Sequence, residues 1–490
     1  MESRSINYRN QESPLKGIDW PTVIIYMLLV VAGAISIYAA SYDFDNASIF
    51  DYSEFSGKQL RWIGLSFVLG LGLLLIDARM YETYAYPIYV AVMILLLITI
   101  FIAPNIKGSH SWIVIGSMSI QPAEFAKFAT ALALAKLFSG YNFSLNASTG
   151  NYMKALAIIF LPVGLILAQN ETGSALVYLG LFFVLYREGM SGLVLLSAIL
   201  AIAIFVISVK FTETMIVGIP SGQFTVYIIV MVTMVTMLAL YSKTADVARN
   251  VALGFTGCGL IVTVLELCGI DVPGQYVFPG MIGAACLYCL FETMRLRVMK
   301  ITAAIGAAII AVAFMFSVNY VFTSVLKPHQ QMRIKVALGI EDDILKAGYN
   351  VNQSKIAIGS GGFAGKGFLK GTQTKLKYVP EQHTDFIFCT IGEEEGFIGT
   401  SLTMMLFVIL ILRVIVIAER QPTTFGRVFA YCVASYFIVH FCINIGMVIG
   451  LCPVIGIPLP FFSYGGSSLW GFTFLLFILL RIDASRRSHH

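Results

Sequence analysis

The stretch NQSKIAIGSGGFAGKGFLKGTQTKLKYVPEQHTDFIFCTIGEEEG, residues 352–396, is the longest polar run between the hydrophobic segments of this chain. The region between Ile344 and Pro380 contains six lysines and no acidic residue, and the run then passes through His383-Thr-Asp385 before the chain becomes apolar again. The lysines are Lys346, Lys355, Lys366, Lys370, Lys375 and Lys377. Because clustered cations attract negative charge, this composition favours an anionic ligand.

The rest of the chain is predominantly hydrophobic. Of the 490 residues, 58% are hydrophobic and 12% are charged, and the mean hydropathy of +0.83 exceeds what a soluble core of this length needs. Runs of roughly 17–25 apolar residues recur, and each can cross a hydrocarbon core about 30 Å thick as a helix. The pattern predicts an all-α polytopic membrane protein with about fourteen crossings. The expected helices are 20–41, 60–77, 85–104, 121–138, 154–169, 173–187, 191–209, 224–242, 251–269, 276–292, 301–322, 397–418, 427–450 and 465–481.

Basic residues orient these helices, because Lys and Arg near helix ends stay on the cytoplasmic side. With the N-terminus inside, every second connection is basic and both termini lie inside. The first apolar run lacks a small-residue cleavage site, so we interpret it as a retained helix. The predicted organisation is a cytoplasmic N-terminus (1–19), a first part of the transmembrane core (20–209), inserted transmembrane segments (210–300), a transmembrane helix (301–322), one large extracytoplasmic loop with the motif His383-Thr-Asp385 (323–396), the last part of the core (397–482) and a cytoplasmic tail (483–490).

Composition argues against three other kinds of site. The eight cysteines lack a disulfide framework, and the close pair Cys286 and Cys289 lacks the further ligands of a metal site. The net charge of +5 fits basic cytoplasmic loops better than nucleic-acid binding. The glycines of residues 359–367 lack the strand and helix that flank a nucleotide-binding loop, although their amides can still receive phosphate oxygens.

Charged residues at membrane depth usually mark a pathway or a site. Glu124 and Lys127 are three residues apart and share one face of a helix that enters from outside, where they could also form a purely structural pair. Glu171 begins another helix at the outer side, where the helix dipole alone would favour a carboxylate. Ser467 belongs to an outer segment that leads into the last helix. His440 fits a hydrogen-bonded interior histidine better than a ligand.

These polar groups open toward the face that carries His383 and Asp385, which suits an anionic substrate with a lipid tail. An enzyme would use Asp385 as general base on a hydroxyl nucleophile, while lysines or a divalent cation stabilise a departing phosphate or pyrophosphate. A transporter would instead move the lipid past Glu124 and Lys127. Transporters usually carry polar residues near the midplane in both halves of related repeats, so the crowding at one face favours the enzyme.

Several blocks of the sequence resemble the SEDS family of membrane glycosyltransferases (shape, elongation, division, sporulation). The likeness covers about residues 20–209 and 328–482 and is strongest from Ala347 to Gly396. The blocks are SKIAIGSGG, GKG, GTQ and PEQHTDFIF within the strongest part, and QPAEFAK (121–127), TTFGR (423–427), NIGMVIG (444–450) and PLPFFSYGGSS (458–468) outside it. The GTQ block favours the rod-shape branch of the family over its division branch.

The resemblance implies a ten-helix core that polymerises lipid II at the outer face of the bacterial cytoplasmic (inner) membrane. The lipid-linked glycan is the donor, lipid II is the acceptor, and undecaprenyl pyrophosphate leaves. Asp385, in the HTDF block, is implied as catalytic base or as holder of a divalent cation, Mg²⁺ or Mn²⁺. A class B penicillin-binding protein is the implied partner. The residues expected to bind substrate are Glu124, Lys127, Glu171, Lys355, Lys366, His383 and Ser467, with the lysine-rich segment supporting pyrophosphate and glycan.

Four features depart from the family pattern. Ser111 stands before Trp112 where the family usually has an arginine, Glu171 stands at a usual aspartate, and Gln382 replaces a common arginine. Together these changes remove two cations near the expected pyrophosphate path. The fourth departure is the stretch 210–300, which would add about four crossings to the family's ten helices.

Overall fold

The computed structural model describes residues 17–42, 54–106, 108–116, 118–212, 214–326, 328–338, 340 and 348–486. It divides into two compact units, each described here by itself. Unit 1 combines residues 1–192 with 349–490, and unit 2 comprises residues 193–348. Lys346 and parts of the predicted cytoplasmic ends, residues 1–16 and 487–490, lie outside the described residues.

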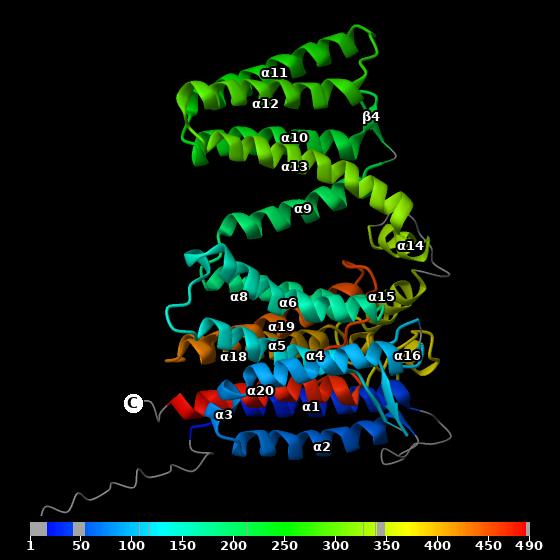
Figure 1. Ribbon diagram of the computed structural model, residues 1–490. Coiled ribbons are helices and arrows are strands. Elements are labelled where there is room, and N and C mark those ends of the chain that lie inside the picture. Colours follow the sequence, from blue (N-terminus) through cyan, green and yellow to red (C-terminus); the bar gives the residue numbers. More distant parts are fainter. Residues whose placement is uncertain are drawn as a thin grey trace, which may run out of the picture. The chain divides into compact units, whose positions relative to one another are not determined.

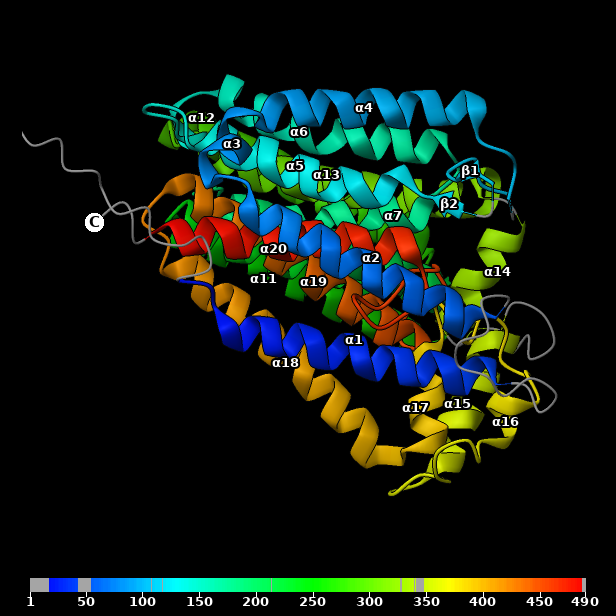
Figure 2. The same cartoon turned by 90° about the horizontal axis from the view of Figure 1, so that it is seen from below.

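Unit 1 is a bundle of membrane-length helices with short elements at its ends (Figures 1 and 2). The long helices are α1 (Trp20–Ser41), α2 (Phe55–Leu75), α4 (Ala85–Ile102), α5 (Pro122–Phe138), α6 (Thr149–Ala168), α18 (Gly396–Glu419), α19 (Thr424–Val448) and α20 (Gly466–Ser485). The shorter elements are α3 (Ala78–Thr83), the hairpin β1 (Ile113–Ile115) and β2 (Met118–Ile120), η1 (Leu145–Ala147), the continuous α7 (Thr172–Leu176), η2 (Val177–Gly180) and α8 (Leu181–Arg187), and α15 (Tyr349–Gly361), α16 (Thr372–Lys375) and α17 (Ile387–Glu394).

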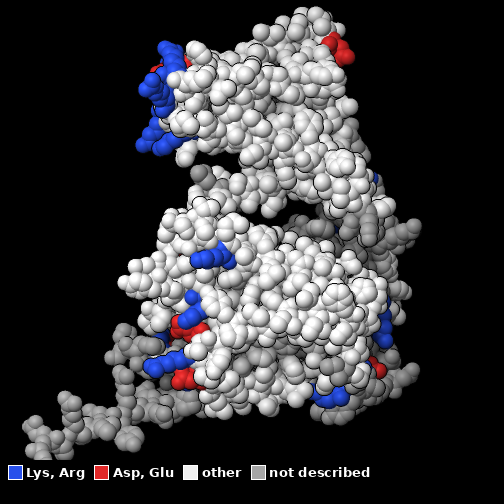
Figure 3. Space-filling model, viewed as in Figure 1, with Lys and Arg blue, Asp and Glu red and all other residues white. Residues whose placement is uncertain are grey.

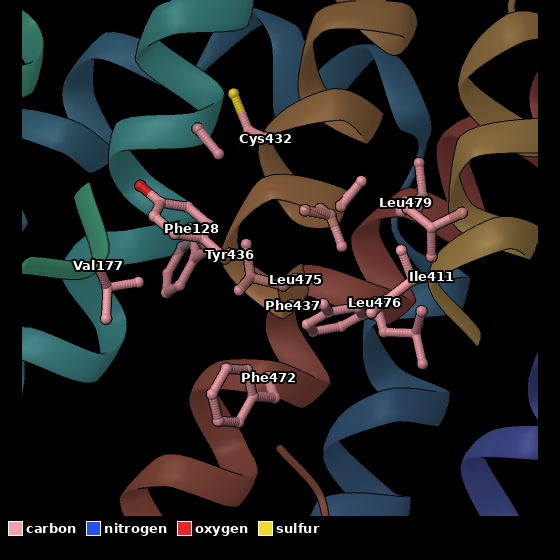
Figure 4. Packing of buried hydrophobic residues seen from close by; sticks show 14 of the residues in the cluster. Phe128, Val177, Ile411, Cys432, Tyr436, Phe437, Phe472, Leu475, Leu476 and Leu479 are labelled. Carbon is pink, nitrogen blue, oxygen red and sulfur yellow. The ribbon is translucent and has the colours of Figure 1, made fainter. Parts of the chain in front are cut away.

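Helix α5 lies at the centre of unit 1 and packs against α4, α6, α19 and α20. Six of its 17 residues are alanines, and small side chains let neighbouring membrane helices approach closely. Figure 4 shows side chains of several helices meeting in this core, among them Phe128 of α5, Phe437 of α19 and Phe472 of α20. The short length of α5 is therefore compatible with the membrane, because protein surrounds it on nearly every side.

The hairpin β1–β2 and helices α15–α17 gather at one end of unit 1, and α3 and the last turn of α20 at the other (Figure 2). The charge pattern places the first of these ends outside. Within the predicted outer loop, α17 is buried along its whole length and packs against α1, α15, α18 and α19. The segment that ends this loop is therefore part of the bundle rather than a covering over it.

Unit 2 contains α9 (Gly192–Lys210), the hairpin β3 (Met215–Ile216) and β4 (Ile219–Pro220), α10 (Ser221–Thr236) with η3 (Met237–Tyr241), α11 (Ala245–Leu267), α12 (Gly274–Leu296), α13 (Ile301–Tyr320) with η4 (Val321–Val325), and α14 (Pro328–Ala337). It has a hydrophobic core of its own, which includes Tyr227, Met234 and Cys289. The stretch 210–300 lies wholly within this unit.

All fourteen predicted segments are helical, and the prediction of an all-α polytopic membrane protein is confirmed in its general form. In the described part of the chain, eleven helices are long and apolar enough to cross a membrane. Of the remaining three predicted crossings, α5 and 172–187 are shorter, and α9 contributes a shorter apolar stretch, Val194–Lys210. On the visible face of each unit, charged side chains lie toward the helix ends and leave a long uncharged middle (Figure 3). The division into ten core helices and four additional ones stays a prediction.

Candidate functional site

Asp385 lies at the outer end of unit 1, in the turn that precedes α17. The side-chain amide of Asn444, on α19, donates one hydrogen bond to the Asp385 carbonyl oxygen (2.9 Å) and another to the Ile457 carbonyl oxygen (2.7 Å). The Asp385 carboxylate lies against Gly456, where an added Cβ would be 3.2 Å from Oδ2. Gly456 also has a φ of +78°, which favours glycine. The backbone of Asp385 is thus held from α19, and its carboxylate packs against the segment between α19 and α20.

His383 connects this turn to two other elements. Its ring stacks on Phe55 of α2, with ring centroids 4.0 Å apart, and meets the edge of Tyr464 at 5.7 Å. The His383 carbonyl oxygen accepts a hydrogen bond from the Tyr464 amide at 2.9 Å. The aspartate therefore lies where α2, α19 and the segment before α20 converge.

A cavity of about 200 Å³ has Thr384, the residue before Asp385, in its wall. Lys58 and Arg61 of α2 line it together with Trp112 and the run 464–467 that begins α20, which includes the predicted residue Ser467. The structure thus brings Ser467 close to the turn of His383 and Asp385. We name this cavity the α2–α20 pocket.

Lys58 and Arg61 were missed by the sequence analysis, although a signal was available. Both residues lie at the start of α2, which is at the outer end of unit 1. Basic residues near membrane helices are biased toward the cytoplasmic side, so two of them at an outer helix end run against the usual pattern. Such an exception calls for a local reason.

Glu124 and Lys127 are buried in the bundle and do not line the α2–α20 pocket. The Lys127 ammonium lies 2.7 Å from Glu124 Oε2 and 3.0 Å from His440 Nε2. His440 Nδ1 lies 3.0 Å from the Pro458 carbonyl oxygen, which can only accept. Nδ1 therefore carries the proton and Nε2 accepts from Lys127, so His440 is neutral. The pair ties α5 to α19 and to the segment before α20, and a role in substrate binding stays a prediction.

Glu171 holds the chain that leads to Trp112. Its Oε2 accepts hydrogen bonds from Ser109 (3.0 Å) and Ser111 (3.1 Å). Burial raises the pKa of Glu171; the two serine hydrogen bonds oppose this rise and the charge of Glu124 adds to it. Two of the departures from the family pattern, Ser111 and Glu171, are thus in direct contact. Glu171 reaches the pocket only indirectly, through the segment that carries Trp112.

Lys366 neutralises a buried carboxylate. Its ammonium lies 2.7 Å from Glu393 Oε1, and the fully buried Glu393 also accepts from the amides of Gln373 (2.9 Å) and Thr374 (2.8 Å). Burial alone would raise the pKa of Glu393, but Lys366 and these amides hold it below its ordinary value. The GTQ block, which begins α16, is therefore held by the Glu393 carboxylate. Lys366 has a structural partner in Glu393, and its contact with substrate stays a prediction.

Two further positions of the outer region contact the helices. Lys355 is exposed on α15, and its ammonium lies beside Gly450, just after the end of α19. Gln382 is buried and donates to the carbonyl oxygens of Ala40 (2.5 Å) and Thr374 (2.7 Å). At this departure from the family pattern the side chain therefore points into the protein, where it connects α1 with α16.

The described residues contain no group of three or more His, Cys, Asp or Glu that could hold a metal ion. Mg²⁺, however, is usually bound by one or two carboxylates together with substrate phosphates and water. Asp385 supplies one carboxylate, which fits a shared site of this kind. A cation would then be held jointly by Asp385 and the substrate.

These features define a multi-pass membrane protein in which the turn that carries Asp385 contributes Thr384 to a pocket with two cations at the outer end of the bundle. A family model described as a cell cycle protein, covering FtsW, RodA and SpoVE, matches residues 19–219 and 220–488. The chain belongs to this family, the SEDS proteins of the bacterial cytoplasmic membrane.

Known relatives agree with this membership. The chain is 30% identical over 466 residues to the peptidoglycan glycosyltransferase RodA of Treponema pallidum, covering 95% of this chain and 97% of the relative. It is 30% identical over 470 residues to the peptidoglycan glycosyltransferase MrdB of Escherichia coli, covering 94% and 93%. A solved structure of a peptidoglycan synthase complex contains a chain with the same fold, with a TM-score of 0.59, 24% identity and coverage of 96% and 98%.

Proposed function

We propose that this chain, a peptidoglycan glycosyltransferase by its family, polymerises lipid II into glycan strands at the outer face of the membrane with Asp385 as catalytic base. The observation that carries the proposal is that Thr384, the residue before Asp385, lines the α2–α20 pocket together with Lys58 and Arg61. The names of the relatives support the reaction class. The burial of α17 and the contacts of Asn444 and Gly456 support a fixed position for the aspartate.

The reaction joins the lipid-linked end of a glycan to a hydroxyl group of lipid II. The Asp385 carboxylate takes the proton of the acceptor hydroxyl, whose oxygen forms the new bond to the anomeric carbon. The bond from that carbon to the diphosphate breaks, and the diphosphate leaves with the electron pair. A diphosphate needs no protonation to depart, so one carboxylate is enough. A divalent cation, Mg²⁺ or Mn²⁺, held between Asp385 and the diphosphate would stabilise the departing charge.

The biological setting is the finer part of the proposal. We assign the chain to cell elongation and rod-shape maintenance, supported by the GTQ block and by the likeness to RodA of Treponema pallidum. A division role of the FtsW type is the alternative. A class B penicillin-binding protein is the proposed partner, supported by the similar chain within a solved peptidoglycan synthase complex.

The test compares Asp385→Asn with a matched control, Asp246→Asn, whose side chain is 87% exposed in unit 2. Purified protein receives labelled lipid II, and the products are separated on a gel. The wild type and the control should form long glycans, whereas Asp385→Asn should form none while keeping its thermal unfolding midpoint. Full polymerisation by Asp385→Asn would refute the assignment of the base.

Two alternatives give different results in the same preparation. A lipid II transporter in sealed vesicles would move lipid II between leaflets without lengthening any glycan. A protein that only assembles the synthesis machinery would tolerate Asp385→Asn in cells without a change of shape.

A further inference from the structure

We propose that the α2–α20 pocket is the binding site for the diphosphate of a polyprenyl-linked ligand, with Lys58, Arg61 and the first turn of α20 as its contacts. The inference rests on the proposed function and goes beyond it by assigning the diphosphate to these groups. It also transfers this role away from the lysine-rich segment that precedes Asp385.

The charge of the pocket selects an anion. Lys58 and Arg61 are three residues apart, so they project from the same face of α2. Among the described residues that line the pocket there is no acidic side chain. An arginine presents its donors as a planar fork that matches phosphate oxygens, and a lysine adds a compact charge. Two adjacent cations match the charge of a diphosphate ligand better than that of a ligand with a single carboxylate.

The start of α20 adds backbone donors. The amide groups in the first turn of a helix have no partner within the helix, and they carry a partial positive charge. Gly465, Gly466 and Ser467 all line the pocket, which places this turn in its wall. A Cβ at Gly466 would lie only 2.1 Å from the Trp62 ring, so glycine is needed for the backbone to come this close. The Gly465 amide donates to Gln59 Oε1 at 3.3 Å, so the amides of Gly466 and Ser467 and the Ser467 hydroxyl are the donors offered to phosphate oxygens.

The size and the apolar side of the pocket indicate a lipid-linked diphosphate. A volume of about 200 Å³ is below the roughly 300–1,000 Å³ of sites for drug-sized ligands, so the pocket takes only part of a larger molecule. Leu65 is in its wall and is 42% exposed, and Val68, one turn further along α2, is 70% exposed. A prenyl chain leaving the pocket along these residues would stay in the hydrocarbon region.

The lysine-rich segment before Asp385 is a weaker candidate for the diphosphate site than the α2–α20 pocket. The ammonium of Lys366 is already paired with Glu393 and Thr372. Lys370, by contrast, is exposed, and it provides the comparison that separates the two explanations.

Binding is measured on purified protein that carries Asp385→Asn, so that no turnover occurs. The probes are undecaprenyl pyrophosphate and inorganic pyrophosphate, titrated by calorimetry in detergent. Lys58→Gln and Arg61→Gln should each weaken binding of both probes roughly ten-fold, since a charged hydrogen bond is removed. Lys58→Arg and Arg61→Lys should restore most of the affinity. Lys154→Gln, which removes an exposed charge at the opposite end of unit 1, and Lys370→Gln should leave it unchanged.

Three results would overturn the proposal: unchanged affinity in the Lys58→Gln/Arg61→Gln double variant, a loss caused by Lys370→Gln instead, or equal affinity of the wild-type pocket for the two probes. Retained thermal unfolding midpoints of the variants show that any loss of affinity does not come from misfolding. Failure of this proposal is distinct from failure of the proposed function. If protein with Asp385 intact polymerises lipid II while the Lys58→Gln/Arg61→Gln variant binds both probes normally, only the diphosphate site is refuted. If binding of the probes depends on Lys58 and Arg61 but protein with Asp385 intact forms no glycan, only the polymerase function is refuted.

Discussion

Removal of the Asn444 amide tests whether the backbone of Asp385 must be held for catalysis. Asn444 is fully buried, and both hydrogens of its amide are used, one on the Asp385 carbonyl and one on the Ile457 carbonyl. In Asn444→Ala both carbonyls lose this donor. Each buried polar group left without a partner costs roughly 1–3 kcal/mol, so we expect the free energy of unfolding to fall by about 2–6 kcal/mol.

The effect on catalysis should exceed the effect on binding. A displacement of the reacting group by about 1 Å can reduce a rate roughly 100-fold. Lys58 and Arg61 belong to α2 and do not depend on Asn444. We therefore expect kcat for glycan polymerisation to fall about 100-fold while KM for lipid II changes little.

The assay is steady-state polymerisation of lipid II at a temperature well below the unfolding midpoint of each variant. Asn444→Asp keeps the shape but replaces the donor with an acceptor, so it should lose kcat as Asn444→Ala does. Asn250→Ala is the matched control, because Asn250 donates to Tyr288 at an exposed position of unit 2. A wild-type kcat in Asn444→Asp would refute the reasoning.

Three further outcomes concern stability in detergent, read from thermal or chemical unfolding. Lys127→Met should lower the free energy of unfolding by about 3–5 kcal/mol, because it leaves Glu124 buried without a counter-charge. Adding Glu124→Gln should recover most of this loss, and a double variant as unstable as Lys127→Met alone would contradict the explanation. Burial raises the pKa of Glu171 above its ordinary 4.5, so stability should fall as pH rises from 4.5 through the raised pKa, and Glu171→Gln should reduce that fall; an identical pH dependence would disprove it. Gly361→Ala should be strongly destabilising because its Cβ would lie 1.9 Å from the Gly392 carbonyl, whereas Gly359→Ala on the same helix has nothing within 4 Å and should be near neutral; equal effects would count against the packing.

The membrane helices could be predicted because their signal is local. A run of apolar residues of the right length identifies a helix without any knowledge of its neighbours, and α5 was expected at 121–138 and is found at Pro122–Phe138. The outer region was harder. Lys366 pairs with Glu393, which is 27 positions further along the chain. A contact over this distance has no local sequence pattern, so the sequence did not show that a lysine of this segment neutralises a buried carboxylate.

The site could be predicted in part. Asp385 emerged from the HTDF block by resemblance. The lysine count pointed to the segment before Asp385, whereas the proposed diphosphate site uses Lys58 and Arg61. Lys58 and Arg61 carried a readable exception to the charge bias of membrane helices. The partnership of Asn444 with Asp385 had no such signal, because the two residues are 59 positions apart and the bond goes to a main-chain oxygen.

The buried pair on α5 also bears on biosynthesis. Lys127 and His440 are 313 positions apart, with the whole of unit 2 between them in sequence. At a translation rate of roughly 5–20 residues per second, α5 waits about 15–60 s for α19 and α20 to be made. A lone lysine would spend that interval uncompensated beside lipid, whereas Glu124, one helical turn away, is inserted with it. The ion pair thus lets α5 enter the membrane without net charge on this turn, before α19 and α20 are made and pack around it.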